Sequence, residues 1–486
     1  MTIWKDRGNQ AGDNLVEVIL NNREIENKKD FLNPSLDKLH SPFELKDMQK
    51  AVSRINQAIK NKEQITIFGD YDVDGISSTS LLLRVFRGME ANVDYYIPNR
   101  LEEGYGLNKE AVKELSQNTD LLITVDCGIK AHEEVNLANE LGIDVIVTDH
   151  HTMPNELPSA LTVINPKRGD YPFKELAGVG VAFKLAQAIL KPEDITEMRE
   201  YLDLITLGTI ADVVPLVDEN RIIVKEGMRI INNNEFNNFN IQHLKNEKYK
   251  GKDLTAGRIG YNITPIINAC GRMGQANKGV EFFTANKKER VEGLAKKVIS
   301  LNEERKEISK RQFKVAERLI EKNDYNDDKV LIIPLHNAQT GVIGITAGDI
   351  KEEYHKPVVV LSINDEGMAT GSGRSIKNFN LYNALEDCGD LLDGFGGHEL
   401  AGGLQIKEEN IDKFREQMNE LADEQLTKED MIKKIKVDKE LTFEDLKKST
   451  VNKLENLRPF GMGNPTPVFK IEGLTLHSFN TIGKEN

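Results

Sequence analysis

Between residues 63 and 150, short apolar runs alternate with stretches of helical spacing, and this alternation constrains the fold more than any other feature of the sequence. Strands that alternate with helices are typical of a parallel sheet with right-handed crossovers. Parallel strands are buried on both faces, which agrees with runs that are apolar throughout. We therefore expect an α/β domain here. The expected strands are 65–68, 93–97, 121–125 and 145–148, and the expected helices are 76–90, 108–117 and 131–141.

Acidic and imidazole side chains directly follow three of these expected strands. The residues are Asp70, Asp72 and Asp74 in GDYDVDG, Asp126 in VDCG, and Asp149, His150 and His151 in TDHH. Because the carboxyl ends of parallel strands meet at one edge, where open α/β sheets bind ligands, these side chains are expected to lie together. Five clustered carboxylates repel one another unless cations lie among them, and Lys130 is the only basic residue in these turns.

A carboxylate-rich set with one or two imidazoles favours Mn²⁺ or Mg²⁺ over a thiolate zinc site. Two such cations about 3.5–4 Å apart can activate water and stabilise both the attacking and the leaving oxygen of a phosphate ester. Each motif alone has a more ordinary explanation. A DxDxD triplet also occurs in Ca²⁺ loops, although the bidentate Glu of an EF-hand is missing here, and a VDCG turn or a histidine pair is often only structural. The combination predicts a two-metal centre for cleaving phosphate esters.

Length and charge bound the classes of protein that remain. A chain of 486 residues suggests about three domains. A net charge of -14 argues against a nucleic-acid partner, but bound divalent cations would reverse the local sign, so the charge excludes nothing. The sequence has no apolar run long enough to span a membrane and no secretion signal. Its three separated cysteines are typical of a reducing compartment, and we expect a cytoplasmic protein.

The rest of the chain suggests further units. Residues 286–323 are highly charged with a broken apolar stripe, which predicts a long helix between two lobes or, alternatively, an ordinary surface helix. A second α/β pattern follows, with glycine-rich turns at 371–373 and 394–397, and the chain then becomes strand-like over a length too short for an independent core. The expected units are an N-terminal segment (1–62), a catalytic domain (63–285), a linker helix (286–324), a second α/β domain (325–430) and an incomplete β domain (431–486).

Five motifs in order resemble those of a known superfamily. GDYDVDG, VDCG, TDHH and LGTIADVVPL resemble the motifs of the DHH phosphoesterases, and GFGGHELAGG resembles the glycine-rich motif of the companion DHHA1 domain. Within that superfamily the chain resembles the RecJ exonuclease family through three further segments, at 31–55, 268–276 and 458–469. The resemblance implies a parallel-sheet DHH domain, a long linker helix, an α/β DHHA1 domain and a partial C-terminal OB-type β segment.

The resemblance also implies roles for residues near the two cations. The implied metal ligands are Asp70 and Asp72 for one cation, Asp74, His150 and Asp212 for the other, and Asp126 as the bridge. Asp212 in IADVVPL is implied by the motif alone, since an Asp before Pro215 also suits a helix end. His151 is expected to face the scissile phosphate, and Asp149 to orient its neighbours.

RecJ-like enzymes grip a 5′-terminal phosphate with arginines, whose planar groups make bidentate contacts with phosphate. Single arginines or histidines can also be ordinary surface residues. The implied substrate-binding residues are Arg100, Arg272, Arg374 and His398, together with Gly396 and Gly397, which would let a strand approach nucleic acid closely.

The implied activity is 5′→3′ hydrolysis of single-stranded DNA to mononucleotides in recombination and repair, with two Mn²⁺ or Mg²⁺ ions. Expected partners are single-stranded DNA with a 5′ phosphate, a single-strand-binding protein and a helicase, and the chain is expected to be a monomer. The alternatives are a short-RNA or cyclic-dinucleotide phosphodiesterase and a non-catalytic replication scaffold. A scaffold would be expected to lose metal ligands that this chain keeps, and an inorganic pyrophosphatase typically has His in the first motif.

Overall fold

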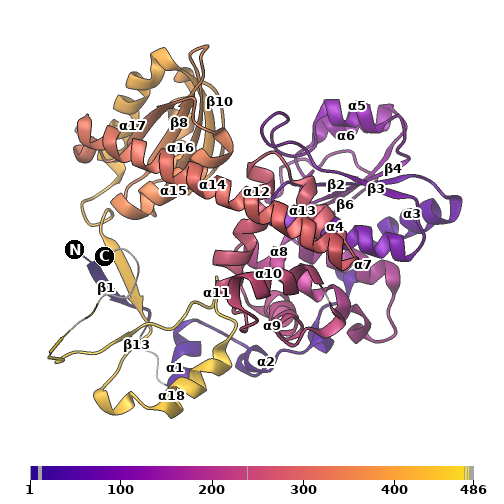
Figure 1. Ribbon diagram of the computed structural model, residues 1–486, viewed down its shortest axis with the longest axis horizontal. Helices are drawn as coiled ribbons and strands as arrows, with labels where there is room; N and C mark the ends of the chain where they lie inside the picture. The colour runs from indigo at the N-terminus through magenta and orange to yellow at the C-terminus, as the bar shows by residue number, and fades with distance from the viewer. Residues whose placement is uncertain are drawn as a thin grey trace.

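The computed structural model describes residues 2–8, 12, 14–237, 239–323, 325–475, 477–478 and 480. Its described part confirms the predicted fold class, with a parallel sheet in the first lobe, a second α/β lobe and short C-terminal strands (Figure 1). None of the helices in these ranges combines the length and apolar character that crossing a membrane requires.

The first lobe is built on a five-stranded parallel sheet. The strands are β2 (Ile65–Gly69), β3 (Val93–Tyr96), β4 (Leu121–Val125), β5 (Asp144–Thr148) and β6 (Thr162–Ile164). Their spatial order is β3-β2-β4-β5-β6, so the order reverses between β2 and β4. Open α/β sheets bind ligands at such a switch point, outside the carboxyl ends of the strands.

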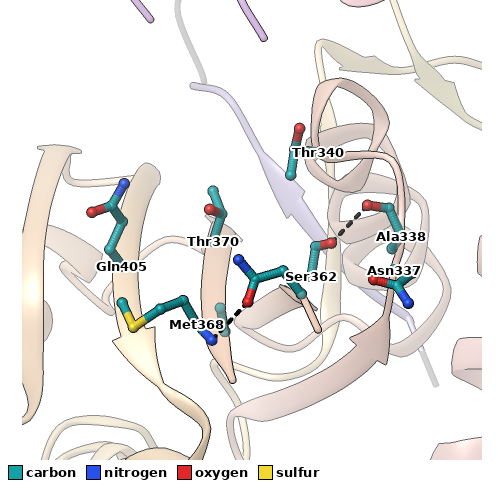
Figure 2. A pocket seen from close by; sticks show the side chains of 9 residues that line it. Asn337, Ala338, Thr340, Ser362, Met368, Thr370 and Gln405 are labelled. Atoms are coloured by element: carbon teal, nitrogen blue, oxygen red, sulfur yellow. Dashed lines mark hydrogen bonds between the residues drawn. The ribbon is translucent and has the colours of Figure 1, made fainter. Parts of the chain in front are cut away.

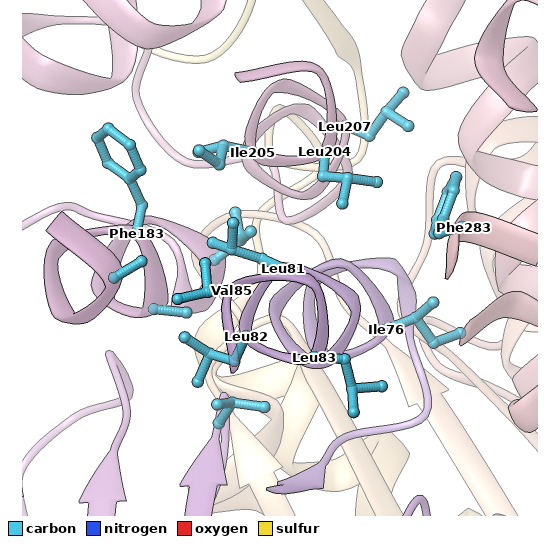
Figure 3. Packing of buried hydrophobic residues seen from close by; sticks show 14 of the residues in the cluster. Ile76, Leu81, Leu82, Leu83, Val85, Phe183, Leu204, Ile205, Leu207 and Phe283 are labelled. Atoms are coloured by element: carbon cyan, nitrogen blue, oxygen red, sulfur yellow. The ribbon is translucent and has the colours of Figure 1, made fainter. Parts of the chain in front are cut away.

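Helices cover both faces of this sheet. α4 (Val73–Gly88) is buried nearly all round because the sheet and other helices enclose it. Figure 3 shows Leu81 and Val85 of α4 between Phe183 of α7 (Gly178–Leu190) and Ile205 of α8 (Leu202–Ala211). This core anchors α4, α7 and α8, whose ends lie at the carboxyl edge of the sheet. α3 (Met48–Asn61), α5 (Lys109–Leu115) and α6 (His132–Glu140) complete the layers.

A long helix connects the two lobes. α14 (Lys288–Lys322) has 35 residues and lies within the segment expected to form the linker. Its first half packs on α10 (Phe239–Tyr249), α12 (Thr264–Arg272) and α13 (Asn277–Thr284), and its second half packs on the next lobe (Figure 1). α9 (Asp218–Asn233), α11 (Ala256–Arg258) and the π-helical turn η5 (Ile259–Ile263) complete the helical side of the first lobe.

The second lobe contains a mixed five-stranded sheet with its own core. In the order β10-β11-β9-β8-β7, only β7 and β8 pair in parallel. The strands are β7 (Leu331–His336), β8 (Val358–Ile363), β9 (Met368–Arg374), β10 (Leu392–His398) and β11 (Ala401–Lys407), and the helices are α15 (Thr340–Tyr354), α16 (Leu381–Asp387) and α17 (Ile411–Gln425).

The N-terminal segment does not form one unit. β1 (Thr2–Asp6) pairs in parallel with β12 (Lys433–Val437), and α1 (Leu15–Asn22) and α2 (Lys28–Leu32) share a small core with α18 (Lys448–Leu454) and Leu457. In contrast, α3 belongs to the first lobe. The start of the chain therefore completes its C-terminal part, which no local pattern indicated.

The sequence of residues 467–479 is strand-like, but among the described residues of this segment only Phe469 and Lys470 lie in a strand. The short β13 (Lys439–Glu440) pairs with β14 (Phe469–Lys470), and the described residues beyond 470 form no strand. Residues 476, 479 and 481–486 of the expected β domain lie outside the described residues.

Candidate active site

The structure brings all six expected metal ligands together at the switch point of the first sheet. Asp70 follows β2, Asp72 caps α4, Asp74 lies in the first turn of α4, Asp126 follows β4, His150 follows β5, and Asp212 caps the end of α8. Three groups have candidate ligand atoms within 4.8 Å of one another: Asp70, Asp72 and Asp126; Asp74, His150 and Asp212; and Asp126, His150 and His151. Asp126 and His150 each belong to two groups.

Tight backbone geometry holds the first motif. The Asp72 carboxylate accepts hydrogen bonds from the backbone N–H groups of Asp74 (2.8 Å) and Gly75 (3.1 Å). A Cβ at Gly75 would collide with the backbone of Asp70, so only glycine permits this turn. Asp126 itself has a φ of +60°, in the left-handed region. Strained backbone conformations of this kind are often found at functional sites.

The N-terminus of α7 binds Asp74, which the sequence interpretation missed. The N–H groups of Gly178 and Val179 donate to the two Asp74 carboxylate oxygens at 2.7 and 2.8 Å. A Cβ at Gly178 would lie 2.6 Å from the Asp126 carboxylate, so this helix approaches two candidate ligands at once. The available signal was the glycine-rich start of an apolar helical run, in AGVGVAF.

Burial and mutual repulsion disfavour charge on the carboxyl groups. Both causes raise the pKa values of Asp70 and Asp126 well above the usual range. They raise the pKa of Asp74 to about 7 and that of Asp212 to about 9. Burial lowers the pKa of His150 to about 4, so its imidazole is neutral at pH 7.

Four buried ligand atoms in this cluster have no hydrogen-bond partner among the described residues: Asp70 Oδ1, Asp126 Oδ1, His150 Nε2 and Asp212 Oδ2. His150 Nε2 lies 3.3 Å from Asp126 Oδ1 and 3.6 Å from Asp212 Oδ2. Buried polar atoms in native proteins are nearly always satisfied. Since the imidazole is neutral, these converging electron pairs fit divalent cations, as the chemistry of the ligand set predicts.

Asp149 and His151 form a pair beside the cluster. His151 Nδ1 lies 2.7 Å from Asp149 Oδ1, which also accepts from the His151 N–H, while Asp149 Oδ2 accepts from the Ile129 N–H. Burial alone would raise the pKa of Asp149 and lower that of His151. Burial is the largest single cause, but the hydrogen bond and the charge attraction between the two side chains, together with N–H donors to Asp149 and nearby carboxylates around His151, outweigh it. The pKa of Asp149 is therefore lowered and that of His151 is raised. His151 Nε2 lies 3.5 Å from the hydroxyl of Tyr105, a residue that was not predicted.

A pocket of about 560 Å³ lies between the two lobes next to His151. Tyr105, Lys130 and His151 line it from the first lobe, and Gly397 and His398 line it from the second. The GGH residues, expected in a turn, instead form the end of strand β10, and this strand end reaches the candidate site. Gly396 lies on β10 but does not line this pocket, and it leaves open space where a side chain would be.

The three expected phosphate-binding arginines come from different elements and lie close to one another. Burial lowers the pKa of Arg272 to about 10, and the charges of Arg100 and Arg374 add to that shift. Arg100 stacks over Tyr71, with its guanidinium carbon 5.0 Å from the ring centre. In the described part of the chain none of the three forms an ion pair with a carboxylate, so the cluster is suited to an anion.

A second pocket, of about 520 Å³, lies in the second lobe and contains none of the predicted site residues. Figure 2 shows its uncharged lining, which includes Asn337, Ser362, Thr370 and Gln405. The Ser362 hydroxyl donates to the Ala338 carbonyl at 2.6 Å. Without titratable or metal-binding groups this pocket offers no hydrolytic chemistry, so the candidate active site is the cluster in the first lobe.

Comparison with known proteins gives three matches to family models. The DHH family N-terminal domain matches residues 64–209, the DHHA1 domain matches residues 327–424, and the RecJ OB domain matches residues 437–486. The chain is 39% identical over 462 residues to the single-stranded-DNA-specific exonuclease RecJ of Bacillus subtilis, covering 93% of this chain and 57% of that protein. It therefore spans less than two thirds of that relative's length.

Other relatives are covered more fully. The chain is 36% identical to the single-stranded-DNA-specific exonuclease RecJ of Dickeya dadantii, over 86% of this chain and 77% of that protein. Among solved structures, it is similar to RecJ from Thermus thermophilus in complex with Mn²⁺. That match has a TM-score of 0.82 and 30% identity, and it covers 94% of this chain and 66% of that one.

Proposed function

The chain belongs to the RecJ family, and we propose that it is a two-metal exonuclease that hydrolyses single-stranded DNA from the 5′ end to mononucleotides. The observation that carries this proposal is the convergence of four unpartnered ligand atoms from four separate segments at one sheet edge, counted over the described residues. We propose 63–285 and 325–430 as the catalytic and DHHA1 domains, 286–324 as the linker, and 431–486 as the OB-type domain.

In this proposal six residues would hold the two cations, Mn²⁺ or Mg²⁺. Asp70 and Asp72 would bind one, Asp74, His150 and Asp212 the other, and Asp126 would serve both, in agreement with the groups of neighbouring ligand atoms. When bound, the cations would neutralise charge on the scissile phosphate and ease deprotonation of the attacking water. The Gly178 and Val179 N–H groups would keep the Asp74 carboxylate in one orientation.

The histidines would act on the phosphate oxygens. Asp149 fixes the His151 ring through Nδ1, so that Nε2 can hold a proton toward the pocket between the lobes. A protonated His151 would stabilise the negative charge that develops on the scissile phosphate. His398, on the opposite wall of the pocket, would contact the neighbouring backbone phosphate, and the glycines before it would let the strand approach.

The arginine cluster would determine polarity. Arg100, Arg272 and Arg374 would bind the 5′-terminal phosphate, which places the first phosphodiester over the metal ligands. Single-strand selectivity would be steric: in this proposal the passage between His151 and the GGH segment at the end of β10 admits one strand and excludes a duplex. We propose a cytoplasmic monomer that acts in recombination and repair, with a single-strand-binding protein and a helicase as partners.

Digestion of labelled oligonucleotides tests the proposal. A single strand carrying a 5′ label should release labelled mononucleotide first, whereas a 3′ label should stay on long products until late, and both reactions should require Mn²⁺ or Mg²⁺. A blunt duplex and a dinucleotide should be cleaved much more slowly than the single strand. Release from the 3′ end first, or faster cleavage of the dinucleotide, would reject the proposed polarity or substrate.

A further inference from the structure

A turn from the C-terminal part of the chain docks directly onto the segment that follows Asp212. We call residues 458–464, RPFGMGN, the C-terminal turn. The Leu216 N–H donates to the Met462 carbonyl at 2.8 Å. Leu216 comes four residues after Asp212, so only three residues lie between the candidate metal ligand and this contact.

Two glycines of the turn are in close contact with this segment. A Cβ at Gly461 would lie 2.6 Å from Leu216 Cδ1, and a Cβ at Gly463 would lie 3.1 Å from Pro215 Cβ. Gly463 also has a φ of +71°, which disfavours any other residue. Leu216 is buried, and it belongs to a small cluster that includes Ile210 of α8.

Buried polar side chains hold the turn in shape. Asn464 is fully buried, and its Nδ2 donates to the carbonyls of Leu457 (2.7 Å) and Pro459 (2.8 Å). Arg221, from α9 in the first lobe, donates to the carbonyls of Arg458 (2.8 Å) and Pro459 (3.3 Å). It also donates to the Phe31 carbonyl at 2.6 Å. The turn is therefore joined to the first lobe by buried hydrogen bonds.

Asp212 depends on its backbone for its position. Its Oδ2 is buried and has no hydrogen-bond partner among the described residues, unlike Asp74, whose two oxygens are held by N–H groups. The next residue, Val213, has a φ of +60°, a strained conformation for a β-branched residue, and is 59% exposed. Contacts on both sides must therefore hold the chain here: α8 before Asp212 and the C-terminal turn after it.

We infer that the C-terminal turn is a positioning element for Asp212, so that docking of the turn and cation binding at Asp212 stabilise each other. The inference rests on the proposed metal centre. Because coupling between two sites is reciprocal, an intact turn raises cation affinity, and the cation protects the docked turn by the same factor. The C-terminal part of the chain would thus regulate the metal centre in addition to any contact with DNA.

Hydrogen exchange on the wild-type chain tests one direction of the coupling. Mn²⁺ binding is first measured by calorimetry, and amide exchange is then compared with and without saturating Mn²⁺. Exchange should slow at least about threefold in peptides covering 208–217 and also in those covering 457–464. If Mn²⁺ binds and slows only the first set, the inference is wrong. If no Mn²⁺ binds, the proposed function fails instead.

Gly461→Ala tests the other direction, with Gly348→Ala as the control because a Cβ at Gly348 meets nothing within 4 Å. The concentration of free Mn²⁺ is measured from its EPR signal during a titration. Gly461→Ala should lower the affinity for one of the two cations about 10-fold or more. The other cation, at Asp70 and Asp72, should bind as in the control. If Gly461→Ala binds each of the two cations as tightly as Gly348→Ala does, the inference is overturned.

Leu216→Ala provides a rescue test in case the Gly461→Ala chain folds poorly. It removes the side chain that the new Cβ would strike. The double variant Gly461→Ala/Leu216→Ala should therefore bind both cations no more weakly than Leu216→Ala alone. If the loss of cation affinity in the double variant equals the sum of the losses in the two single variants, the contact does not carry the coupling and the inference is rejected.

Discussion

Replacing Asp212 by Asn should increasingly stabilise the metal-free protein as the pH rises from 5 to 8, while removing a proposed metal ligand. Burial, followed by repulsion from Asp74 and Asp72, raises the pKa of Asp212 from its ordinary value of 3.8 to about 9. A carboxyl group whose pKa is higher in the folded chain contributes its full stabilisation when the pH is below its pKa in the unfolded chain. That contribution is lost as pH rises through the folded value. The pH range over which Asp212 lowers the free energy of unfolding therefore extends from about pH 4 to about pH 9.

The magnitude follows from the number of protons bound. Between pH 5 and pH 8 the folded chain keeps a proton on Asp212 that the unfolded chain has released. Each pH unit then lowers the free energy of unfolding by about 1.4 kcal/mol for this group, or about 4 kcal/mol over the three units. The replacing asparagine cannot titrate and has nearly the same shape, so the variant should lose this part of the pH dependence.

Urea unfolding followed by circular dichroism measures the effect. Wild type and Asp212→Asn are compared in EDTA at pH 5, 6, 7 and 8. The control is Asp412→Asn, whose side chain is 92% exposed and which should follow the wild type. The difference between Asp212→Asn and wild type should grow by about 4 kcal/mol from pH 5 to pH 8. Parallel pH curves for the two proteins would refute the reasoning.

Metal should oppose this difference in stability. A ligand that binds only the folded state at 100 times its Kd adds about 2.7 kcal/mol. At pH 7.5, saturating Mn²⁺ should therefore stabilise the wild type, and Asp212→Asn should gain much less because one cation has lost a ligand. Equal stabilisation by Mn²⁺ would mean that Asp212 does not contact a cation.

Three further changes test other parts of the site. Gly178→Ala places a Cβ 2.6 Å from the Asp126 carboxylate and should lower kcat about 100-fold or more, with an unchanged dichroism spectrum; near-normal turnover would exclude this crowding. Arg374→Ala should raise KM about 10-fold for 5′-phosphorylated single strands and little for 5′-hydroxyl strands; equal effects on both would separate Arg374 from the terminal phosphate. Burial raises the pKa of the Asp203 carboxyl to about 6, so this group should lower the free energy of unfolding by about 3 kcal/mol between pH 4 and pH 7. Asp203→Asn should abolish that decrease, and an unchanged dependence of the unfolding free energy on pH would show that Asp203 does not cause it.

Local pattern was sufficient for the parts of the site that lie at strand ends. The alternation of strands and helices predicted a parallel sheet, and parallel strands necessarily bring Asp70, Asp126 and His150 to the same edge. Asp212 was implied only by resemblance, because it ends a helix and no periodicity distinguishes it from other helix-ending acids. The assignment of each ligand to a cation stays a proposal.

The sequence by itself determined the class of fold and the chemistry of the ligand set, since both depend on residue type and short-range spacing. Only the tertiary structure decided which distant groups complete the site. The N–H groups at Gly178 and Val179 reach Asp74 from 104 and 105 residues away. The first strand pairs with residues 433–437. The C-terminal turn docks beside Asp212. Such contacts depend on how whole elements pack, and backbone N–H and C=O groups occur at nearly every position, so the sequence does not indicate which distant partner each of them meets.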